Sequence, residues 1–525
     1  MHFALQAASP AGWREAPVVF WNNGWVTPEA AGDEGRVRYN GGCRINRYRW
    51  TRIGFGFTPA ADGGVTVRLR APATPGQPPV ALRRLEAAGT RVENPHFDER
   101  EPGGLSGWTW LGEPGAVRPA GLGASASGEI EVQLVSGAGL EQRIPVTAGV
   151  PVRISLFARA LTPPGYEEMV RLPAQGTAAH DALRHFRRGI NLGNYLEAPP
   201  GEDWGAQYTA ADFDAIRQEG FDHVRIPCAW HHHLGPAPDF QVRAAFYEQV
   251  DGLVEAAHER GLAVILNWHH FDAFTDAPDE HLEVFETVWV AIAARYAARP
   301  GRIAFELLNE PRAAATTEVM NRVYARVLPA IRAVAPHHPI LVGPGRWNRI
   351  AELPALRLPT DDDNLIVTVH DYEPFLFTHQ GAEWTGPATA TVGLSFPGPP
   401  ARPVAPDPAA LAQADWVAAW FRAYQILEEP CNPCGAAALS ENLRLAAAWA
   451  AYYGRPVHVG EWGCIASADP VSRAAYLRHK RLALDEIGLP WALWDWSARF
   501  AYWDRETARP HDGLRAALGL EGAAP

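Results

Sequence analysis

The spacing of hydrophobic residues differs between the first and second parts of the chain. In the first part, short β-rich runs, most of which alternate apolar and polar residues, lie at 18–21, 64–70, 129–135 and 150–160, and Gly, Pro and Asn separate them. Such alternation between turn residues is typical of antiparallel strands that bury one face. We therefore expect an all-β sandwich over residues 1–180.

Beyond residue 181 the pattern changes to almost purely apolar runs separated by longer amphipathic stretches. The amphipathic stretches at 209–220, 280–299 and 316–335 have a helical period. Eight apolar runs are strand candidates, at 186–193, 223–228, 263–270, 303–310, 339–345, 365–372, 456–463 and 490–496. This is the repeat number of a (β/α)8 TIM barrel, which we expect over 181–525, with 176–183 as the linker. A doubly wound open sheet is the alternative, but no G-x-G-x-x-G follows the first strand.

Composition and charge exclude some classes of protein. With 47% hydrophobic and 20% charged residues, both parts can bury ordinary cores. The net charge of −12 and the absence of a basic cluster argue against a nucleic-acid partner. No run approaches the roughly 18 apolar residues of a membrane span. The N-terminus lacks the basic and apolar regions of an intact signal peptide, but a start can be trimmed, so this says little about location.

Polar and aromatic residues collect where the expected barrel strands end: Asn191, Asn194, Arg225, His269, His270, Asn309, Glu310, Trp347, His370, Tyr372, Glu461 and Trp494. A barrel brings the carboxyl ends of its strands to one mouth, where catalytic groups from several strands meet. Glu310 and Glu461 end the fourth and seventh strands, which face each other across that mouth. Two facing glutamates can divide glycoside hydrolysis between an acid and an ionised nucleophile; the alternative is a salt-bridged structural pair.

Seven stretches of the second part carry a family resemblance. They are RGINLGNYLEAP (188–199), HVRIPCAW (223–230), ILNWHHF (265–271), FELLNEP (305–311), VTVHDYEPFLFTHQGAEW (367–384), PVHVGEWG (456–463) and ALWDW (492–496). With them, residues 186–520 resemble glycoside hydrolase family 5, especially its bacterial endoglucanases with cellulase and mannanase activity. A single N-E-P is a weak signal, whereas all seven stretches in this order are a specific one.

The resemblance implies a role for each matching residue. Glu310 is the expected general acid/base, with a pKa raised by the neighbouring carboxylate, and Glu461 is the expected nucleophile, kept ionised by Arg225. Asn309 is expected to bind the sugar 2-hydroxyl, Tyr372 to hydrogen-bond the nucleophile, His370 to sit beside the acid/base, His269 to contact the same sugar and Trp494 to stack on it. Asn194, Glu197, His270, His379 and Trp384 match positions that line this and neighbouring sugar subsites.

The activity implied is that of a retaining endo-β-1,4-glucanase acting on cellulose or β-glucan by double displacement, without a cofactor or metal. A β-mannanase, a mixed-linkage glucanase, a xyloglucanase and an exo-acting β-glucosidase are alternatives within enzymes. A non-catalytic glycan-binding barrel is the alternative from another class, and the presence of both glutamates argues against it. The expected partner is a polysaccharide or oligosaccharide. We expect a monomer that is secreted or periplasmic, with the cytoplasm as the alternative.

The front domain leaves two interpretations open. Residues 91–114 and 150–160 resemble carbohydrate-binding sandwich modules, in which Trp108 or Trp110 would contact glycan. In the alternative, both Trp pack in the core of a structural sandwich. The second interpretation is favoured, because Trp in alternating strands most often serves packing.

Three further features are ambiguous. An insertion at 385–455, with a Pro-rich loop (393–408) and a possible helix within 415–434, either roofs the cleft or is an inert surface segment. Cys431 and Cys434 form a lone C-x-x-C, which is a weak metal or redox signal. His231, His232 and His233 are adjacent and cannot easily ligate one metal, so we expect them to line a subsite or face solvent.

Overall fold

The structure, a computed structural model, describes residues 2–8, 19–21, 41–44, 47–57, 59, 62–71, 79–101, 104–113, 117–120, 131–135, 137–162, 168–299, 301–413, 415–426 and 432–520. Two compact units form: residues 1–168 with 398–441, and residues 169–397 with 442–525. The first unit therefore ends before the boundary expected at 180, and part of the insertion belongs to it.

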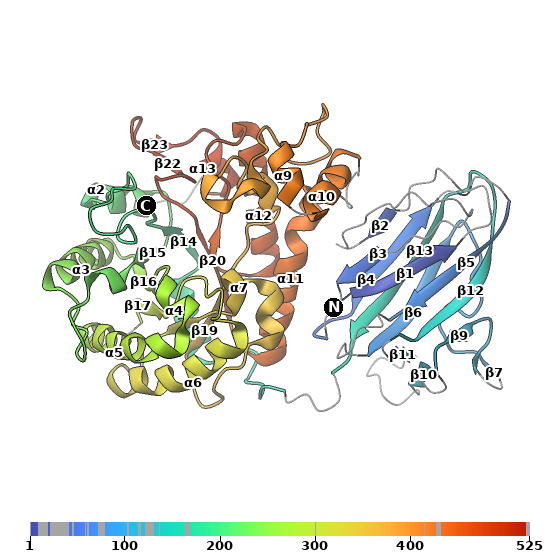
Figure 1. The fold of residues 1–525 in the computed structure, drawn as a ribbon, viewed down its shortest axis with the longest axis horizontal. Coiled ribbons are helices and arrows are strands. Elements are labelled where there is room, and N and C mark those ends of the chain that lie inside the picture. The colour runs from blue at the N-terminus through green and yellow to red at the C-terminus, as the bar shows by residue number, and fades with distance from the viewer. Residues whose placement is uncertain are drawn as a thin grey trace. The chain divides into compact units, whose positions relative to one another are not determined.

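Two antiparallel sheets dominate the first unit, in the strand orders β3-β1-β5-β12-β9 and β10-β11-β6-β13-β4-β2 (Figure 1). Their strands are β1 His2–Ala8, β2 Val19–Trp21, β3 Gly41–Arg44, β4 Thr51–Phe57, β5 Gly63–Arg70, β6 Val80–Ala88, β9 Thr109–Leu111, β10 Val117–Ala120, β11 Glu131–Leu134, β12 Gly139–Val146 and β13 Val152–Ala160; β7 Arg100–Glu101 and β8 Gly104–Leu105 form a separate pair. Buried and exposed residues alternate along β12, as the sequence pattern predicts for a strand with one core face. The all-β prediction is confirmed.

Trp108 belongs to the core of this unit. Its side chain is only 6% exposed, its ring centroid lies 5.6 Å from that of Phe97, and its Nε1–H donates to the carbonyl of Asn94 at 3.1 Å. Trp110 is partly buried and packs against the same core. The packing interpretation is confirmed for Trp108, which is not available to stack on a sugar.

Eight parallel strands of the second unit close into a barrel, in chain order from β14 to β21. They are β14 Arg188–Asn191, β15 His223–Cys228, β16 Ala263–Trp268, β17 Ile303–Glu306, β18 Ile340–Val342, β19 Leu365–His370, β20 Val457–Trp462 and β21 Trp491–Leu493. Every strand lies within a predicted run, and several end earlier than predicted. The TIM-barrel prediction is confirmed.

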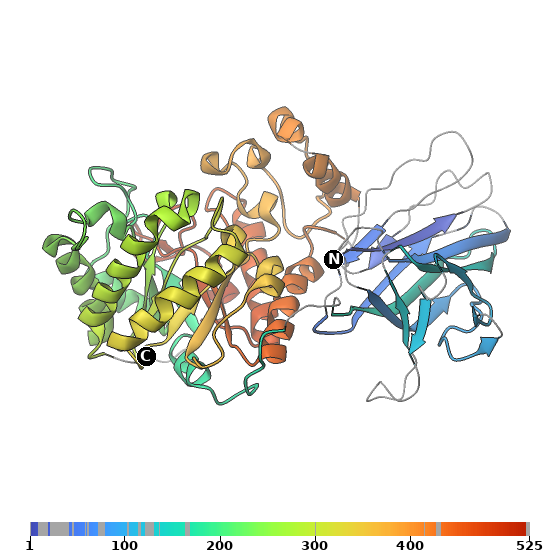
Figure 2. The same cartoon turned by 60° about the horizontal axis from the view of Figure 1, so that its bottom comes forward.

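Helices surround the strands, and Figures 1 and 2 show α3, α5 and α6 on the outside of the barrel. The longer helices are α2 Ala210–Gln218, α3 Ala244–Glu259, α5 Pro278–Tyr296, α6 Thr317–Val334, α11 Ala436–Tyr453 and α12 Pro470–Ile487. Local sequence sets where they begin: Thr209 and Asp212 form a capping box before α2, and Thr316 accepts from the Val319 N–H at the start of α6. The three helical stretches predicted from the sequence are α2, α5 and α6.

The segment 176–183, predicted as a linker, is part of the barrel fold. It forms helix α1 (Ala178–Ala182), whose Ala179 is fully buried. Ala179 and Phe186 share a core cluster with strand residues Ala263, Ile265, Ala304, Leu341 and Ile366. The linker prediction is wrong, because small apolar side chains in 176–183 pack against the barrel.

The remaining elements are the helices α4 Asp272–Asp276, α7 Gly345–Asn348, α8 Phe375–Thr378, α9 Pro408–Gln413, α10 Asp415–Ile426 and α13 Leu514–Ala517, the pair β22 Trp503–Asp504 and β23 Arg509–Pro510, and the 3-10 turns Leu183–His185, Trp230–His233, Ile350–Ala355, Glu383–Thr385 and Pro387–Thr389. Helix α10 is the helix predicted within the insertion. Cys434 is buried, whereas Cys431 lies outside the described residues. Within the described part of the chain, no helix is long and apolar enough to cross a membrane.

Candidate active site

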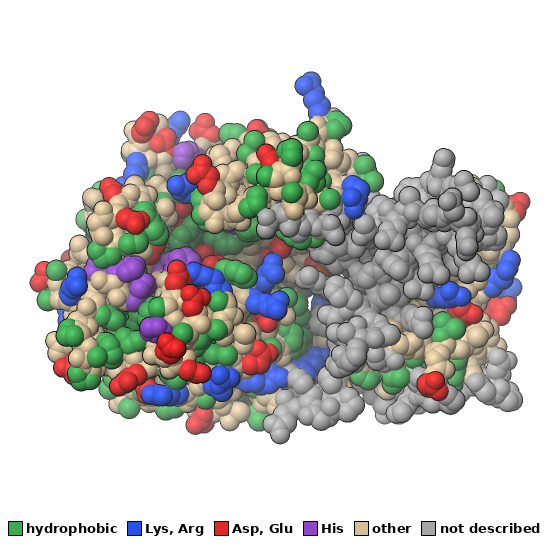
Figure 3. All heavy atoms as spheres, viewed as in Figure 1, with side chains coloured by type: hydrophobic (Ala, Val, Ile, Leu, Met, Phe, Trp, Pro, Cys, Tyr) green, Lys and Arg blue, Asp and Glu red, His purple; other side chains and the backbone are tan. Residues whose placement is uncertain are grey.

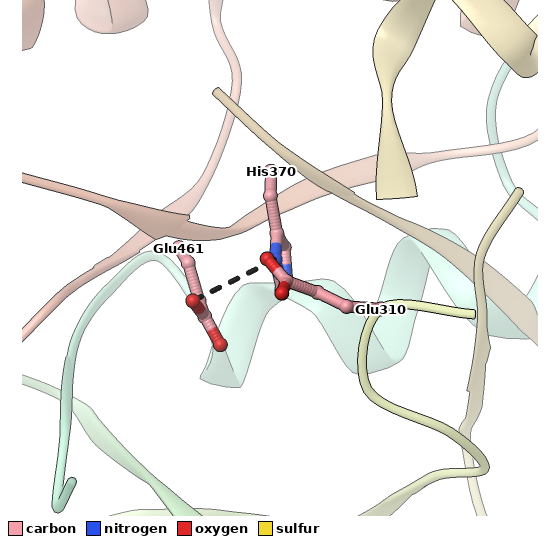
Figure 4. A group of neighbouring side chains, drawn as sticks. All are labelled: Glu310, His370 and Glu461. Atoms are coloured by element: carbon pink, nitrogen blue, oxygen red, sulfur yellow. Dashed lines mark hydrogen bonds and ion pairs between the residues drawn. The ribbon is translucent and has the colours of Figure 1, made fainter. Parts of the chain in front are cut away.

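Glu310 and Glu461 come from opposite sides of the barrel mouth. Glu461 lies in β20, the seventh barrel strand, and Glu310 lies in the loop after β17, the fourth. Figure 4 shows the two carboxyl groups pointing toward each other, with His370 of β19 beside them. One oxygen of each glutamate and one ring nitrogen of His370 all lie within 4.8 Å of one another. The carboxyl groups are thus close enough to act on one bond.

A register irregularity aligns His370 with Glu461. Strands β19 and β20 pair in parallel with Val369 opposite Val459, and the irregularity that follows makes Glu461, and not Gly460, the partner of His370. As a result His370 Nδ1 lies 2.8 Å from Glu310 Oε1 and 3.6 Å from Glu461 Oε2. One imidazole nitrogen therefore faces both carboxyl groups.

Two further donors are directed at Glu461. Arg225, fully buried in β15, donates from Nη1 to Glu461 Oε1 at 2.7 Å, and the Tyr372 hydroxyl donates to Oε2 at 3.0 Å. A cation and a hydroxyl that both donate to a carboxylate stabilise its ionised form. Glu310 has no such pair of donors among the described side chains, and its side chain hydrogen-bonds to His370.

The three ionisable groups influence one another. Burial acts to raise the pKa of Glu310, but the hydrogen bond and charge of His370 outweigh it, and the pKa is lowered. At Glu461 burial prevails over His370 and Arg225, and the pKa is raised. Burial would lower the pKa of His370, but the charges of Glu461 and Glu310 raise it. The prediction that the pKa of Glu310 is raised is therefore wrong, because the closest charged neighbour of this carboxyl group is the imidazole of His370.

These three residues are also the group of described side chains whose spacing suits a metal ion. A metal would have to compete with the Arg225 and Tyr372 donors that already occupy Glu461. It would also lie beside the buried guanidinium, whose positive charge repels a cation. The contacts favour proton transfer over metal binding.

Asn309 is held in a fixed orientation next to the pair. It is fully buried, its Oδ1 accepts from Arg225 Nη2 at 2.6 Å, and its Nδ2 lies 3.5 Å from His269 Nε2. His269 Nδ1 lies 2.9 Å from Asn267 Oδ1 and donates to it, so that Nε2 is the acceptor side of the ring. Burial lowers the pKa of His269 well below its usual range, which keeps the ring neutral. Trp494 stacks on this ring at a centroid distance of 5.6 Å.

The loop that carries Glu310 has a strained backbone. Glu310 has φ 46°, in the left-handed region that non-glycine residues rarely adopt. Its N–H donates to Asn348 Oδ1 at 2.6 Å, and the Trp347 N–H donates to the Pro311 carbonyl at 3.0 Å. These bonds hold the conformation that presents the Glu310 side chain to the mouth.

The other residues predicted for sugar subsites lie on neighbouring loops of the same unit. Both oxygens of Glu197 accept backbone N–H groups, from Asn194 and from Tyr195, and burial raises the pKa of Glu197 to about 7. His379 packs against Tyr372 at a centroid distance of 4.8 Å, and burial lowers its pKa to about 3.

Trp384 and His270 complete the predicted set. Trp384 is half exposed, with the Arg499 guanidinium 4.9 Å from its ring centroid. The His270 ring lies edge-on to His269 at a centroid distance of 4.1 Å, and its Nδ1 lies 3.4 Å from Arg312 Nη1. Contacts with sugar remain predictions for all of these residues.

Histidine side chains gather at the surface on the face of the barrel unit shown in Figure 3. The rings of the triplet have different neighbours: His231 stacks on Phe271 at 4.9 Å and accepts from Trp268 Nε1 at 3.1 Å, whereas His233 stacks on Phe246 at 3.8 Å. All three are partly exposed.

Sequence reasoning did not assign a role to several residues that build the site. Glu306, at the end of β17, and Asn191, at the end of β14, both accept from Arg225, and Asn348 fixes Glu310. Asn191 stood among the polar strand ends. Glu306 could have been found from the sequence, because it is a carboxylate that directly follows the apolar run IAF.

Comparison with known proteins agrees with this geometry. A family model described as cellulase (glycosyl hydrolase family 5) matches residues 185–500. The chain is 34% identical over 206 residues to Endoglucanase H of Acetivibrio thermocellus, covering 39% of this chain and 22% of that protein. It is 28% identical over 360 residues to Endoglucanase 3 of Fibrobacter succinogenes, covering 65% of this chain and 53% of that protein. The chain spans about half or less of the length of these curated relatives.

A similar solved structure is that of the endoglucanase Cel5A from Thermotoga maritima. It is 32% identical with a TM-score of 0.55, over 64% of this chain and 98% of that one. Cel5A has also been solved in complex with mannotriose and with cellobiose. The family model covers more than half of the chain and includes all eight barrel strands with both glutamates. The chain belongs to glycosyl hydrolase family 5.

Proposed function

We propose that this protein is a retaining endo-β-1,4-glucanase that hydrolyses β-1,4-glucan by double displacement. The observation that carries the proposal is the approach of Glu310 and Glu461, whose oxygens come within 4.8 Å across the mouth. Retaining enzymes hold their two carboxyl groups about 5–5.5 Å apart, whereas inverting enzymes need roughly 6.5–9.5 Å to fit a water molecule. The endoglucanase relatives support the same activity.

In the first step Glu461 attacks the anomeric carbon of the sugar. A bond forms from its carboxylate oxygen to that carbon, and the bond to the glycosidic oxygen breaks. Glu310 gives its proton to the departing oxygen, which leaves as an alcohol, and Glu310 remains as a carboxylate that the hydrogen bond with His370 stabilises. In this proposal the Asn309 amide, which accepts from Arg225, binds the 2-hydroxyl, an interaction that strengthens in the transition state.

In the second step water replaces Glu461. Glu310, now a carboxylate, accepts a proton from the water as its oxygen bonds to the anomeric carbon, and the ester bond to Glu461 breaks. Arg225 and Tyr372 stabilise the carboxylate that departs. Because each displacement inverts the carbon, the product keeps the β configuration.

The substrate class has a second candidate. Cel5A has been solved with mannotriose as well as cellobiose, which favours a β-mannan as the alternative polysaccharide. A glucan and a mannan differ at the 2-hydroxyl, which we propose Asn309 binds, so discrimination would depend on how this amide and the surrounding loops accept an axial hydroxyl. We also propose that the substrate is met outside the cytoplasm, because such polymers are extracellular.

We also propose that the two parts of the chain have different roles. The proposed catalytic residues all lie within 181–525, and the sandwich within residues 1–168 serves glycan binding or structure. With Trp108 in the core, the structural role is the better supported of the two.

A time-resolved product profile tests the proposed activity. The protein is incubated with carboxymethylcellulose, mixed-linkage β-glucan, xyloglucan and β-mannan, and viscosity is followed together with released sugars. An endo-β-1,4-glucanase lowers the viscosity of the glucans early and releases oligosaccharides. Glucose from the first minutes without a fall in viscosity would indicate exo action, and faster turnover of mannan than of any glucan would favour the mannanase.

A further inference from the structure

Glu306 is a fully buried carboxylate that the proposed reaction does not use. It ends strand β17, four positions before Glu310, and both it and Arg225 are 0% exposed. Burying two charges is costly unless each is paired and hydrogen-bonded, so a charge in this place needs a reason.

The contacts of Glu306 are directed at one partner. Its Oε2 accepts from Arg225 Nε at 2.5 Å and its Oε1 accepts from Arg225 Nη2 at 3.0 Å, while the Thr368 hydroxyl lies 3.5 Å from Oε1. This is the two-pronged geometry in which a carboxylate fixes the plane of a guanidinium.

The remaining N–H groups of Arg225 also have acceptors. Nη1 donates to Glu461 at 2.7 Å and to Asn191 at 2.9 Å, and the second Nη2 hydrogen goes to Asn309 at 2.6 Å. A guanidinium has five N–H groups, and each of them has an acceptor here. Arg225 cannot rotate without losing several of these bonds, so the position of Glu306 sets the position of the donors to Glu461 and Asn309.

Glu306 also shares the charge of Arg225. Burial would lower the pKa of Arg225, but the charges of Glu306 and Glu461 raise it. Glu461 is faced by Arg225, His370, Tyr372 and Glu310. Glu306 offsets part of the Arg225 charge, so Glu461 is stabilised less strongly as an anion than by an unshared guanidinium. A carboxylate that is too stable is a poor nucleophile.

We propose that Glu306 is a positioning residue, which orients Arg225 toward both Glu461 and Asn309 and limits how strongly Arg225 stabilises the Glu461 anion. The inference rests on the proposed function for its catalytic consequence. Its structural part, the effect of Glu306 on Arg225 and Glu461, stands independently.

The test compares Glu306→Gln with Glu306→Asp. The first keeps the size of the side chain and removes its charge; the second keeps the charge but is too short to reach both Nε and Nη2. Glu219→Gln is the matched control, because Glu219 is also a buried carboxylate paired with an arginine, Arg515 at 3.3 Å, and also accepts from the Tyr502 hydroxyl. Folding is checked by circular dichroism and the thermal midpoint.

Glu306→Gln should lower kcat by about tenfold or more, as loss of an outer partner of an active-site group typically does, with a smaller change in KM. The limb of the kcat/KM profile that reports the ionisation of Glu461 should move to lower pH, because the charge of Arg225 then acts on Glu461 alone. Glu306→Asp should lower kcat without moving this limb. Glu219→Gln should change only stability.

Carbon-13 NMR of the glutamate carboxyl groups gives a second readout that needs no activity. The Glu461 carboxyl should titrate at lower pH in Glu306→Gln than in the wild type. If this shift is found in a protein that hydrolyses no β-glycan, the proposed function fails and the positioning role stands. An unshifted Glu461 titration with wild-type kcat in Glu306→Gln overturns the inference. If that variant does not fold, wild-type kcat in Glu306→Asp overturns it instead.

Discussion

Arg225 and Glu461 lie 236 positions apart in the chain, and a 2.7 Å hydrogen bond joins Nη1 of the first to Oε1 of the second. The barrel makes this contact possible, because strands β15 and β20 direct their side chains to a common mouth. Through Asn309, the same guanidinium reaches the loop of the second glutamate. Arg225 thus contacts both the proposed nucleophile and the residue before the proposed acid/base. Variants of the residues around Arg225 can therefore test each role separately.

Glu310→Gln and Glu461→Gln should each lower turnover of a natural polysaccharide by about 10³-fold or more, as loss of an essential catalytic group does. Both should keep the wild-type circular dichroism, because the side chains lie at the mouth. Steady-state rates on β-glucan check this, with Glu383→Gln, an exposed carboxylate on the Glu383–Thr385 turn, as the control. If either variant retained more than a few per cent of activity while the control was normal, that role would be wrong.

An aryl β-glycoside separates the two glutamates. A phenolate with a low pKa leaves without protonation, so Glu310→Gln should form the glycosyl ester at a rate near that of the wild type and then stall at hydrolysis. A burst of phenolate followed by a slow steady state is the expected trace. Glu461→Gln should give no burst, and a burst in that variant would contradict its role as nucleophile.

His370→Ala should move the whole pH profile of kcat/KM to higher pH. His370 lowers the pKa of Glu310 and also acts to lower that of Glu461, so its removal raises both. The acid and basic limbs, which the ionisation of these two coupled carboxyl groups sets, therefore both shift upward. Initial rates across the pH range check this, and a downward or absent shift would contradict the arrangement.

Asn309→Ala should lower kcat/KM by about a hundredfold, comparable to the loss of one well-placed donor to a transition state. The same variant should lose sensitivity to the 2-hydroxyl: the wild type should cleave a 2-deoxy aryl glycoside far more slowly than the parent glycoside, and the variant should treat the two alike. Equal discrimination by both proteins would place the 2-hydroxyl contact elsewhere.

Phe186→Ala should destabilise the protein by about 3–5 kcal/mol, because a buried aromatic ring is replaced by a cavity. Phe186 is 1% exposed and packs with Ala179 against the barrel strands. Urea unfolding gives the free energy, with the partly buried Leu183→Ala as the milder comparison. Well below the unfolding midpoint kcat should be normal, since the mouth is built from other residues; a large loss of kcat there would contradict the separation.

The barrel strands could be predicted because their signals are local. Short runs rich in apolar residues, such as HVRIPC, occur once per repeat, and β15 matches its prediction residue for residue. The linker prediction failed for 176–183, because the small side chain of Ala179 gives no sign that it fits a barrel core.

The approach of Glu310 and Glu461 could be predicted because carboxylates at strand ends are few and a barrel makes them converge. Glu306 escaped notice because its role depends on a partner, Arg225, that lies 81 positions away in the sequence. Asn348 escaped for a related reason: its contact is with the backbone N–H of Glu310, which leaves no mark on residue type. The pKa order of the glutamates depends on the placement of His370, which the register irregularity before it decides.

The stereochemistry of the first product tests the double displacement most directly. The protein is added to a soluble β-1,4-gluco-oligosaccharide, and proton NMR follows the anomeric signals before mutarotation. If Glu461 forms a covalent ester and Glu310 then activates water, the newly formed reducing end must appear first as the β-anomer, with the α signal growing later at the rate of mutarotation. An initial α-anomer would mean that water attacks directly, and would contradict the assignment of Glu461 as nucleophile.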